Sequence, residues 1–392
     1  MQYDVCVVGG FGHVGLPLSI AFAMKGLKTC AFDISKDKEV KIKNGEMPFI
    51  EDVDDEVLKG VLNSGALKIS TNPNDISESK SIIITIGTPL DERGNPKLNV
   101  VEKAVEAYFR YFRDNQLIIL RSTVYPGTTN KLKELFKSHK INVLIAFCPE
   151  RIVEGKALKE LFELPQIIGA EDKESAEAAS DLFKNITKDM IITGTAEAEL
   201  SKLMSNAWRY IKFAAANQFY IMCDEAGIDF YKVLDVMQYK YPRAADLPKA
   251  GFAAGPCLFK DTSQLAAFNN NRFLLGNSAI AINEGLPYYI VSKIKKDYNL
   301  QKKVVGILGM AFKNEVDDPR DSLSYTLRNL LEYNAKKVLC SDPYIKDDAF
   351  VSPENLIKES DIIILATPHK KYKELIIPKE KLLIDVWNFF SK

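Results

Sequence analysis

The chain has 392 residues, which is more than a single ordinary core needs and predicts two or three domains. Its 52 lysines and arginines balance its 52 aspartates and glutamates, so no overall charge attracts nucleic acid or an anionic membrane. With 46% hydrophobic residues, no apolar run of membrane-spanning length and no signal-peptide pattern at the start, the sequence predicts a globular cytoplasmic protein that binds neither nucleic acid nor membranes.

Sulfur and imidazole ligands for metals are scarce in this chain. The six cysteines are scattered, and no two of them form a C-x-x-C pair. Only three histidines accompany them. The sequence therefore predicts neither a disulfide framework nor a metal site.

The first predicted elements form a dinucleotide-binding unit. A short apolar strand over residues 4–8 runs into Gly10-x-Gly12-x-x-Gly15, a helix follows to residue 26, and a second strand over residues 28–33 ends in Asp33. In this order the first glycine permits a tight turn, the second lets the backbone approach a pyrophosphate, and the third permits close helix packing. Asp33 is placed to bind ribose hydroxyls and to repel a 2′-phosphate, which favours NAD over NADP. The predicted NAD contacts of this unit are Gly10, Gly12, His13, Val14, Gly15 and Asp33.

Four later strands are expected over residues 81–86, 117–120, 143–147 and 167–168, with helical stretches between several of them. This alternation predicts a parallel, doubly wound sheet whose ligand site lies at the carboxyl ends of the strands. Three loops fall there, over residues 87–89, 121–129 and 148–156. Their hydroxyls and carboxylates are expected near the nicotinamide, although any one of them can instead cap a helix or face solvent. The predicted cofactor contacts in these loops are Thr88, Pro89, Ser122 and Thr123.

A long helix is predicted from Thr195 to just before Gly227. Thr195 can cap its start, and about thirty residues at 1.5 Å each give roughly 45 Å, a length that suits a domain bridge or a dimer core. Lys202 and Asn206 lie four residues apart and so share a face. That face is either an exposed polar edge or a pair of charge-stabilising groups in a cleft.

The last part of the chain repeats the opening pattern. Residues 302–313 are again a strand followed by glycines, residues 336–342 are a strand that ends in Asp342, and residues 360–368 parallel residues 81–89. The second copy has only G-x-x-G and adds Lys313 and Arg320. We therefore expect it to hold a different ligand from NAD, such as a nucleotide-linked substrate with a diphosphate, unless these basic residues are merely solvated.

Taken together, these motifs resemble the UDP-glucose/GDP-mannose dehydrogenase family over essentially the whole chain. The resemblance rests on the glycine loop, the three loops and the helix above, a stretch Cys257-Leu-Phe-Lys260-Asp261, and the segment from Gly309 to Arg320. It implies a UDP-sugar substrate that is oxidised at its C6 alcohol to the uronate, with two NAD⁺ consumed. The long helix after Thr195, which is rich in alanine and aromatic residues, predicts at least a homodimer.

The resemblance implies a role for individual residues. Cys257 is the expected nucleophile that captures the aldehyde as a thiohemiacetal and then carries a thioester. Lys202 and Asn206 are expected to stabilise oxyanion charge. Thr123, Glu154 and Asp261 are expected to position the water that acts as proton acceptor and hydrolytic nucleophile. The expected substrate contacts are Glu150, Arg151, Glu154, Lys202, Asn206, Arg243, Phe252, Gly255, Phe312, Lys313 and Arg320, with Arg243 reaching across a subunit boundary.

The predicted fold class is α/β, with two Rossmann-like, doubly wound domains joined by a long central helix and a helical dimerisation region. The predicted boundaries are residues 1–195 for an NAD-binding domain, 196–298 for a central helical domain with the cysteine loop, and 299–392 for a UDP-sugar-binding domain.

The chain departs from the family pattern at several positions. Pro256 precedes the cysteine where the family commonly has a glycine pair, Phe259 replaces a proline, His13 stands where tyrosine is common, and Arg121 stands where glutamate or lysine is common. Two alternatives stay open, a two-domain hydroxyacid dehydrogenase that needs no Cys257 and a non-catalytic nucleotide-sugar-binding protein. The sugar also stays open among glucose, N-acetylmannosamine, N-acetylglucosamine and GDP-linked mannose.

Overall fold

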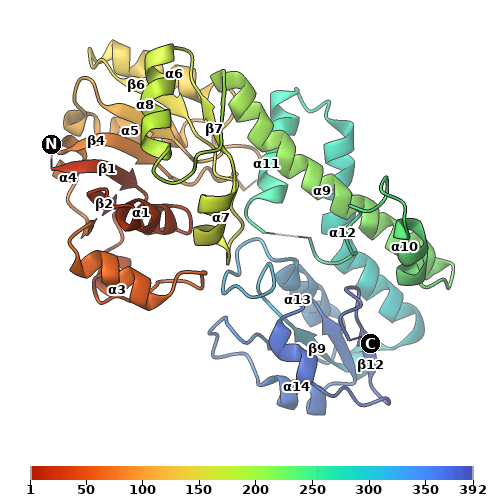
Figure 1. Ribbon diagram of the computed structural model, residues 1–392. Helices are drawn as coiled ribbons and strands as arrows, with labels where there is room; N and C mark the ends of the chain where they lie inside the picture. The colour runs from red at the N-terminus through yellow and green to blue at the C-terminus, as the bar shows by residue number, and fades with distance from the viewer. Residues whose placement is uncertain (1, 93, 254, 391–392) are drawn as a thin grey trace. The chain divides into compact units, whose positions relative to one another are not determined.

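The computed structural model describes residues 2–92, 94–253 and 255–390. Two compact units follow each other along the chain, and the division between them falls at Ser205 and Asn206. In Figure 1 the first unit runs from red to green and the second from green to blue. The three-domain division expected from the sequence stays a prediction.

The first unit is built on an eight-stranded sheet of order β3-β2-β1-β4-β5-β6-β7-β8. All neighbouring strands are parallel except β6 and β7, which pair antiparallel through Phe147 and Gly169. The parallel alternation is confirmed, with a correction at this one pair and shifts of about two residues at some strand ends. The strands are β1 (Tyr3–Val8), β2 (Thr29–Phe32), β3 (Leu67–Ser70), β4 (Ser79–Ile84), β5 (Leu117–Leu120), β6 (Leu144–Phe147), β7 (Gln166–Gly169) and β8 (Met190–Thr193).

Helices cover both faces of this sheet (Figure 1). Successive side chains of a strand point to opposite faces, so Val5 and Val7 of β1 join one buried cluster with Phe22, while Cys6 joins another with Phe136. Burial on both faces explains why the central strands β5 and β6 are continuous apolar runs. The helices are α1 (Gly15–Met24), α2 (Lys36–Lys43), α3 (Asp55–Asn63), α4 (Asn74–Ser77), α5 (Val100–Glu106), η1 (Phe109–Tyr111), α6 (Thr128–Ser138), α7 (Ala157–Glu163) and α8 (Lys173–Phe183).

The predicted long helix is present as α9 (Thr195–Glu225), with 31 residues. It ends where Gly227 adopts a left-handed conformation, with φ of 70°, and the N–H of Ile228 bonds back to the carbonyl of Cys223. This closure is the usual glycine ending of a helix. Because the division between the two units falls inside α9, Lys202 belongs to the first unit and Asn206 to the second.

The second unit contains a four-stranded, all-parallel sheet of order β10-β9-β11-β12. Its β9 lies between β10 and β11, as β1 lies between β2 and β4 in the first sheet, so the predicted internal duplication is confirmed. Among the described residues, no helix is both long enough and apolar enough to cross a membrane. The elements are α10 (Phe230–Gln238), α11 (Leu258–Phe268), α12 (Leu274–Asp297), η2 (Leu300–Lys302), β9 (Val304–Leu308), α13 (Leu323–Asn334), β10 (Lys337–Ser341), α14 (Pro353–Glu359), β11 (Ile362–Leu365), η3 (Lys370–Glu374) and β12 (Leu382–Ile384).

Candidate active site

The glycine loop after β1 has the geometry of a phosphate cradle. A Cβ at Gly10 would lie 2.7 Å from the Val7 carbonyl oxygen, and one at Gly15 would lie 2.3 Å from the Gly9 carbonyl oxygen, so the packing of the chain requires both glycines. A Cβ at Gly12 would meet only that Gly9 oxygen among the described residues, at an ordinary 3.5 Å. The packing of the described residues therefore does not require a glycine at position 12, which leaves room there for the backbone approach that the predicted pyrophosphate contact needs.

The end of α1 next to this loop is left open. Val14 is the residue before the helix, and no side chain caps the first turn. In the first turn Leu16 donates to the Gly12 carbonyl at 3.0 Å and Pro17 has no N–H, so the N–H of Gly15 is the group of this turn that can meet the phosphates of NAD. His13 of the same loop is half-buried and stacks on Phe49, with ring centroids 3.9 Å apart. These residues fit the cofactor that the sequence predicts.

Asp33 follows β2 at the same edge of the sheet. One carboxylate oxygen accepts from the N–H of Phe11 at 3.2 Å, and the other from the N–H groups of Ile34 and Ser35 at 2.7 and 3.2 Å. The side chain is half-buried, so it retains an open side for ribose hydroxyls.

The loops after β4 and β5 are bonded to one another. The hydroxyl of Thr88 donates to the Thr123 carbonyl at 2.5 Å, and the hydroxyl of Ser122 reaches the Ile84 carbonyl at 3.4 Å. Pro89 is exposed next to Thr88. The four cofactor contacts predicted in these loops therefore lie together at one edge of the first sheet.

A buried ion pair anchors the loop after β6. The Arg121 guanidinium, 2% exposed, bonds one oxygen of Glu150 at 2.5 and 2.8 Å and also reaches the side-chain oxygen of Gln166 at 2.9 Å. The other Glu150 oxygen accepts from the N–H groups of Arg151 and Ile152. Both oxygens of Glu150 are thus engaged inside the unit, and the Arg151 guanidinium donates to the Pro165 carbonyl.

Glu154 stands farther along the same loop. One of its oxygens lies 3.1 Å from Nδ1 of His13, so the predicted catalytic carboxylate adjoins the glycine loop. The start of α7 beyond it is capped from another loop, because Glu51 accepts from the N–H of Ala157 and Asp52 accepts from those of Leu158 and Lys159. The loop that carries Glu150 and Glu154 is therefore fixed at both ends.

In the second unit, two buried asparagines anchor the start of the segment that leads from Gly251 to Cys257, here called the cysteine loop. The Asn217 amide donates to the Gly251 carbonyl at 3.1 Å and accepts from the Gly251 N–H at 2.8 Å, and it also donates to Asn283 at 2.9 Å. Both asparagines are fully buried. Gly251 is packed against the Trp387 ring, which a Cβ would meet at 2.4 Å, and Phe252 is 5% exposed in the adjoining core.

Sequence reasoning missed this anchor. Asn217 lies three helical turns beyond Asn206 on α9 and so shares its face, which is the signal that could have revealed it.

Cys257 precedes the first residue of α11 and is exposed. The start of a helix favours negative charge through its free N–H groups, so the position suits a sulfur that must act as an anion. One turn later Asp261 is fully buried, accepts from the Asn206 amide at 2.5 Å, and lies 3.1 Å from the Lys260 ammonium. Asn206 is therefore bonded to a residue of α11, the helix that Cys257 precedes. Lys202, one turn before Asn206 on α9, is half-buried.

The segment of residues 309–321, here called the substrate loop, packs on the cysteine loop. The Gly255 N–H donates to the Asp321 carbonyl at 3.2 Å, and a Cβ at Gly255 would lie 2.3 Å from the Phe312 ring. Arg320 is held by its neighbour Asp318, with Nη2 at 2.5 Å from a carboxylate oxygen. Lys313 is half-buried.

Arg243 lies on an exposed segment, where its guanidinium stacks over the ring of Tyr241.

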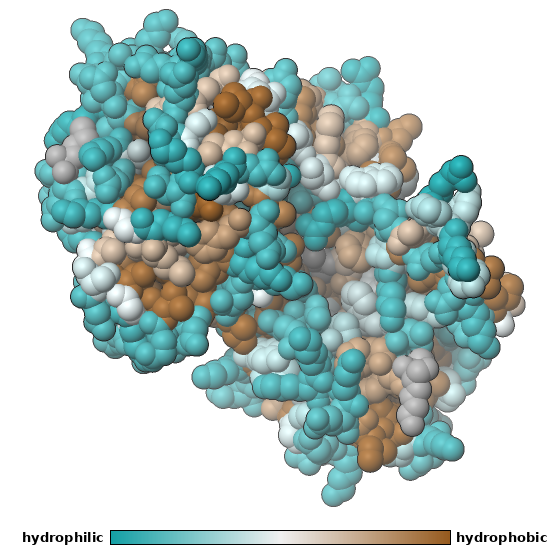
Figure 2. Space-filling model, in the orientation of Figure 1, coloured by the Kyte–Doolittle hydropathy of each residue, from teal (hydrophilic) through white to brown (hydrophobic). Residues whose placement is uncertain are grey.

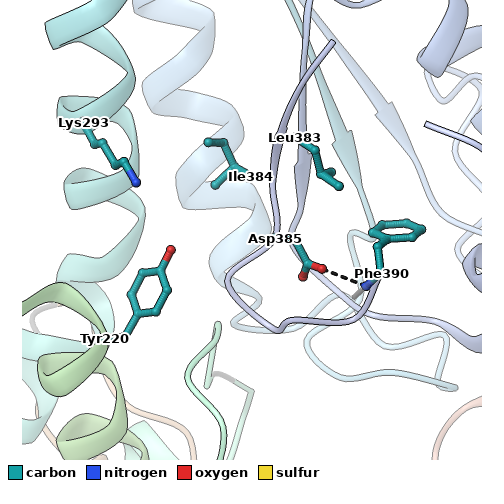
Figure 3. Close-up of a pocket in the computed structure, with 6 residues that line it drawn as sticks. All are labelled: Tyr220, Lys293, Leu383, Ile384, Asp385 and Phe390. Carbon is teal, nitrogen blue, oxygen red and sulfur yellow. Dashed lines mark hydrogen bonds between the residues drawn. The ribbon is translucent and has the colours of Figure 1, made fainter. Parts of the chain in front are cut away.

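A cavity of about 380 Å³ in the second unit contains none of the residues predicted to bind ligands. Figure 3 shows that Tyr220, Lys293 and Asp385 contribute its polar groups. Lys293 is paired with Asp224 at 2.5 Å, and one oxygen of Asp385 accepts from the N–H groups of Phe389 and Phe390. Two of its three polar side chains are therefore bonded within the chain.

The sequence matches three domain models of one family. They are the NAD binding domain over residues 3–187, the central domain over residues 196–284, and the UDP binding domain over residues 306–392 of the UDP-glucose/GDP-mannose dehydrogenase family. The chain belongs to this family. A UDP-N-acetyl-D-mannosamine dehydrogenase of Methanocaldococcus jannaschii is 32% identical, with 99% of this chain and 93% of the relative aligned.

Solved structures agree with this assignment. That of a UDP-D-ManNAc dehydrogenase from Pyrococcus horikoshii has a TM-score of 0.92 at 29% identity, covering 99% of this chain and 96% of the other. That of a UDP-glucose dehydrogenase from Pyrobaculum islandicum has a TM-score of 0.90 at 25% identity, covering 99% and 98%. The UDP-glucose/GDP-mannose dehydrogenase family member described here is therefore an NAD-dependent oxidoreductase of UDP-sugars. Its second nucleotide domain separates it from the two-domain hydroxyacid dehydrogenase alternative.

Proposed function

We propose that the chain oxidises UDP-N-acetylmannosamine at C6 to the uronate, with UDP-glucose as the second candidate. Relatives named as UDP-N-acetyl-D-mannosamine dehydrogenases align over nearly the whole chain at 30 to 32% identity. A UDP-glucose dehydrogenase shares the fold at 25% identity. The observation that carries the catalytic proposal is the placement of an exposed Cys257 at the start of α11, one turn before a buried Asp261 that is bonded to Asn206.

The overall reaction converts RCH₂OH, two NAD⁺ and one water into RCOO⁻, two NADH and three H⁺. NAD⁺, when bound, supplies the hydride acceptor. Cys257 adds to the C6 aldehyde, so that a C–S bond forms and the aldehyde oxygen takes up a proton. After the second oxidation, water attacks the resulting thioester and the C–S bond breaks, which returns the thiol.

We assign the remaining roles from the resemblance to the family, supported where the structure gives a contact. The Asn206 amide, which its bond to Asp261 orients, and Lys202 stabilise negative charge on the substrate oxygen. Asp261, Thr123 and Glu154 hold the water that accepts protons and later attacks. Glu150 acts indirectly, because both its oxygens are engaged by Arg121 and the loop backbone.

On the substrate side, we assign Arg151, Phe252, Gly255, Phe312, Lys313 and Arg320 to the nucleotide sugar.

We further propose that the protein works in the cytoplasm as a homodimer or larger homo-oligomer. Large apolar side chains of α9 are exposed on the single chain, with Met204 at 53%, Trp208 at 55% and Met222 at 57%. In Figure 2, hydrophobic atoms also reach the surface at the right-hand edge, where α10 lies. Arg243, exposed on its own chain, is assigned to the substrate of the neighbouring subunit.

A substrate panel tests the activity. Purified protein with NAD⁺ is offered UDP-N-acetylmannosamine, UDP-N-acetylglucosamine, UDP-glucose and GDP-mannose, and NADH is followed by absorbance. We expect two NADH per sugar, with UDP-N-acetylmannosamine giving the highest kcat/KM. One NADH per sugar would indicate a simple alcohol dehydrogenase, and none would indicate a binding protein.

Replacing the nucleophile tests the mechanism. Cys257→Ser should lose uronate formation by at least about a hundredfold, because a serine hydroxyl does not form the thioester. NAD binding should be unchanged. Cys223→Ser, a half-buried cysteine of α9 outside the site, is the matched control and should retain activity. Full uronate production by Cys257→Ser would contradict the proposal that a thioester forms on Cys257.

A further inference from the structure

Asp33 after β2 and Asp342 after β10 occupy corresponding positions in the two sheets but differ in exposure. Asp33 keeps an open side, whereas the Asp342 side chain has no exposed surface. One Asp342 oxygen accepts from the N–H groups of Met310 and Ala311 at 2.7 and 3.0 Å and lies 3.2 Å from Nε2 of His369. The other accepts from the N–H groups of residues 344 and 345. Asp342 therefore has no oxygen left for a ribose.

His369 bridges Asp342 to the substrate loop. Its Nδ1 lies 3.1 Å from the N–H of Glu315, and the ring is fully buried. A backbone N–H can only donate, so Nδ1 must carry a lone pair. The proton of the neutral ring then sits on Nε2 and is donated to Asp342. Burial alone would raise the pKa of Asp342, but the hydrogen bond from His369 and the backbone N–H groups outweigh it and lower the pKa to about 2.

Further close contacts lie at the point of the strand order where a sheet of this kind usually receives its ligand. In the order β10-β9-β11-β12 the chain reverses direction across the sheet between β9 and β11. There the Thr367 hydroxyl donates to the Ala311 carbonyl at 2.6 Å, and a Cβ at Gly309 would lie 2.5 Å from Thr367. Glu315 itself adopts a left-handed conformation, with φ of 61°, which its bond to His369 helps to hold.

We propose that His369 is a positioning residue for the nucleotide sugar, fixing the substrate loop through its neutral Nε2–H form. The proposal rests on the assignment of Lys313 and Arg320 to the substrate. The loop leaves the His369 contact at Glu315 and reaches the cysteine loop through Phe312 and Asp321. His369 thereby acts on both the substrate side chains and the segment that carries Cys257.

The Glu315 side chain adds two further contacts to the same point of the substrate loop. Its carboxylate accepts from the Lys370 N–H at 2.8 Å and from the Tyr344 hydroxyl at 3.2 Å. The ring of His369 also contacts the rings of Tyr344 and Tyr372 edge-on. The His369 side chain is therefore the centre of a packed group that holds Glu315.

A matched pair of variants tests separately the two hydrogen bonds of His369, one to the Glu315 N–H and one to Asp342. The amide oxygen of His369→Asn stands near the Nδ1 position and keeps an acceptor for Glu315, whereas the amide of His369→Gln stands near Nε2 and keeps the bond to Asp342. UDP binding to the full chain is measured by calorimetry, and KM and kcat are measured with the sugar that the panel identifies. We expect His369→Gln to bind UDP about tenfold more weakly, with KM for the sugar raised similarly and KM for NAD unchanged.

We expect His369→Asn to bind UDP within about twofold of the unchanged protein. The exposed His139 supplies the control, since His139→Asn should change neither constant. Equal UDP affinity of the unchanged protein and His369→Gln would overturn the proposal. So would equal losses in the Gln and Asn variants, which would indicate a general loss of packing.

A measurement on the unchanged protein does not depend on how the variants fold. Only three histidines are present, so nitrogen-labelled imidazoles can be assigned by single substitutions. We expect His369 to show the Nε2–H tautomer, because its Nδ1 accepts from the Glu315 N–H. An Nδ1–H tautomer would overturn the proposal. If the unchanged protein bound no UDP, the proposed substrate would fail, while the tautomer would still decide the placement of His369.

Discussion

Arg121 shows how one unusual residue changes the role of its neighbour. The sequence marks it only as a departure before Ser122, and it marks Glu150 as a substrate contact. In the structure the two form a buried ion pair, and two backbone N–H groups engage the second Glu150 oxygen. Glu150 therefore shapes the loop that carries Glu154, because a buried charge keeps the partner that neutralises it.

The ion pair gives a prediction for stability. Glu150→Ala leaves the Arg121 guanidinium buried without its carboxylate and should lower the free energy of unfolding by about 3 to 5 kcal/mol. The double variant Arg121→Met, Glu150→Leu removes both charges at similar volume and should be more stable than Glu150→Ala. Urea denaturation of the three proteins measures this. A double variant that is no more stable than the single one would contradict the ion-pair account.

At the scale of elements, α7 depends on a distant loop for its cap. Its own preceding residue, Lys156, provides no side-chain cap, and Glu51 and Asp52 accept from its first three N–H groups instead. Carboxylates at a helix start also interact favourably with its dipole. This capping contact could not be predicted from the sequence, because about a hundred residues separate Glu51 and Asp52 from α7.

Glu51 makes this cap dependent on pH. Burial, as the largest cause, raises the pKa of Glu51 from 4.5 to about 6. The folded state then binds its proton more tightly than the unfolded state, so this contribution to stability is present below about pH 4.5 and is lost as pH rises through about 6. Glu51→Gln should remove about 1 kcal/mol of that change, a figure reduced for solvent screening.

Chemical denaturation at several pH values between 4 and 7 measures the effect of Glu51, with Glu56→Gln on the exposed side of α3 as the control. An unchanged pH profile in Glu51→Gln would contradict the proposed origin of the shift.

The elements that could be predicted from sequence are those defined by local signals. The glycine loop, α9 and the repeated strand order carry such signals, because periodicity, capping residues and glycines act within a few residues. The antiparallel pairing of β7 with β6 could not be predicted, since it depends on one contact between Phe147 and Gly169. The anchor of Gly251 by Asn217 was equally hidden, because amide pairs form only once the helices have packed.

At the scale of the whole molecule, the cofactor residues and the cysteine loop reside on two different compact units. The first contains the glycine loop, Thr123 and Glu154, and the second contains Cys257, Asp261 and the substrate loop. Asn206 was predicted as half of a polar pair, and its bond to buried Asp261 emerged only from the packing of α9 on α11.

Assembly of the molecule gives the last prediction. If the exposed apolar face of α9 forms the proposed dimer, Trp208→Asp should raise the dimer dissociation constant by at least about thirtyfold, because a buried interface tryptophan is typically a dominant contact. Sedimentation velocity over a range of concentrations measures this. Tyr333→Asp, at a 91% exposed position of α13, is the control and should leave the assembly unchanged. A monomer at micromolar concentration before any substitution would contradict the dimer.

The glycine loop has a consequence for how such chains diverge. Gly10 and Gly15 are required by the neighbouring backbone, whereas the packing of the described residues does not require Gly12, the residue we assign to the cofactor. Selection for folding alone would therefore preserve the first two and leave position 12 free to drift. A descendant that keeps Gly10 and Gly15 but has a larger residue at position 12 would be recognisable as one that retained the architecture and abandoned its cofactor.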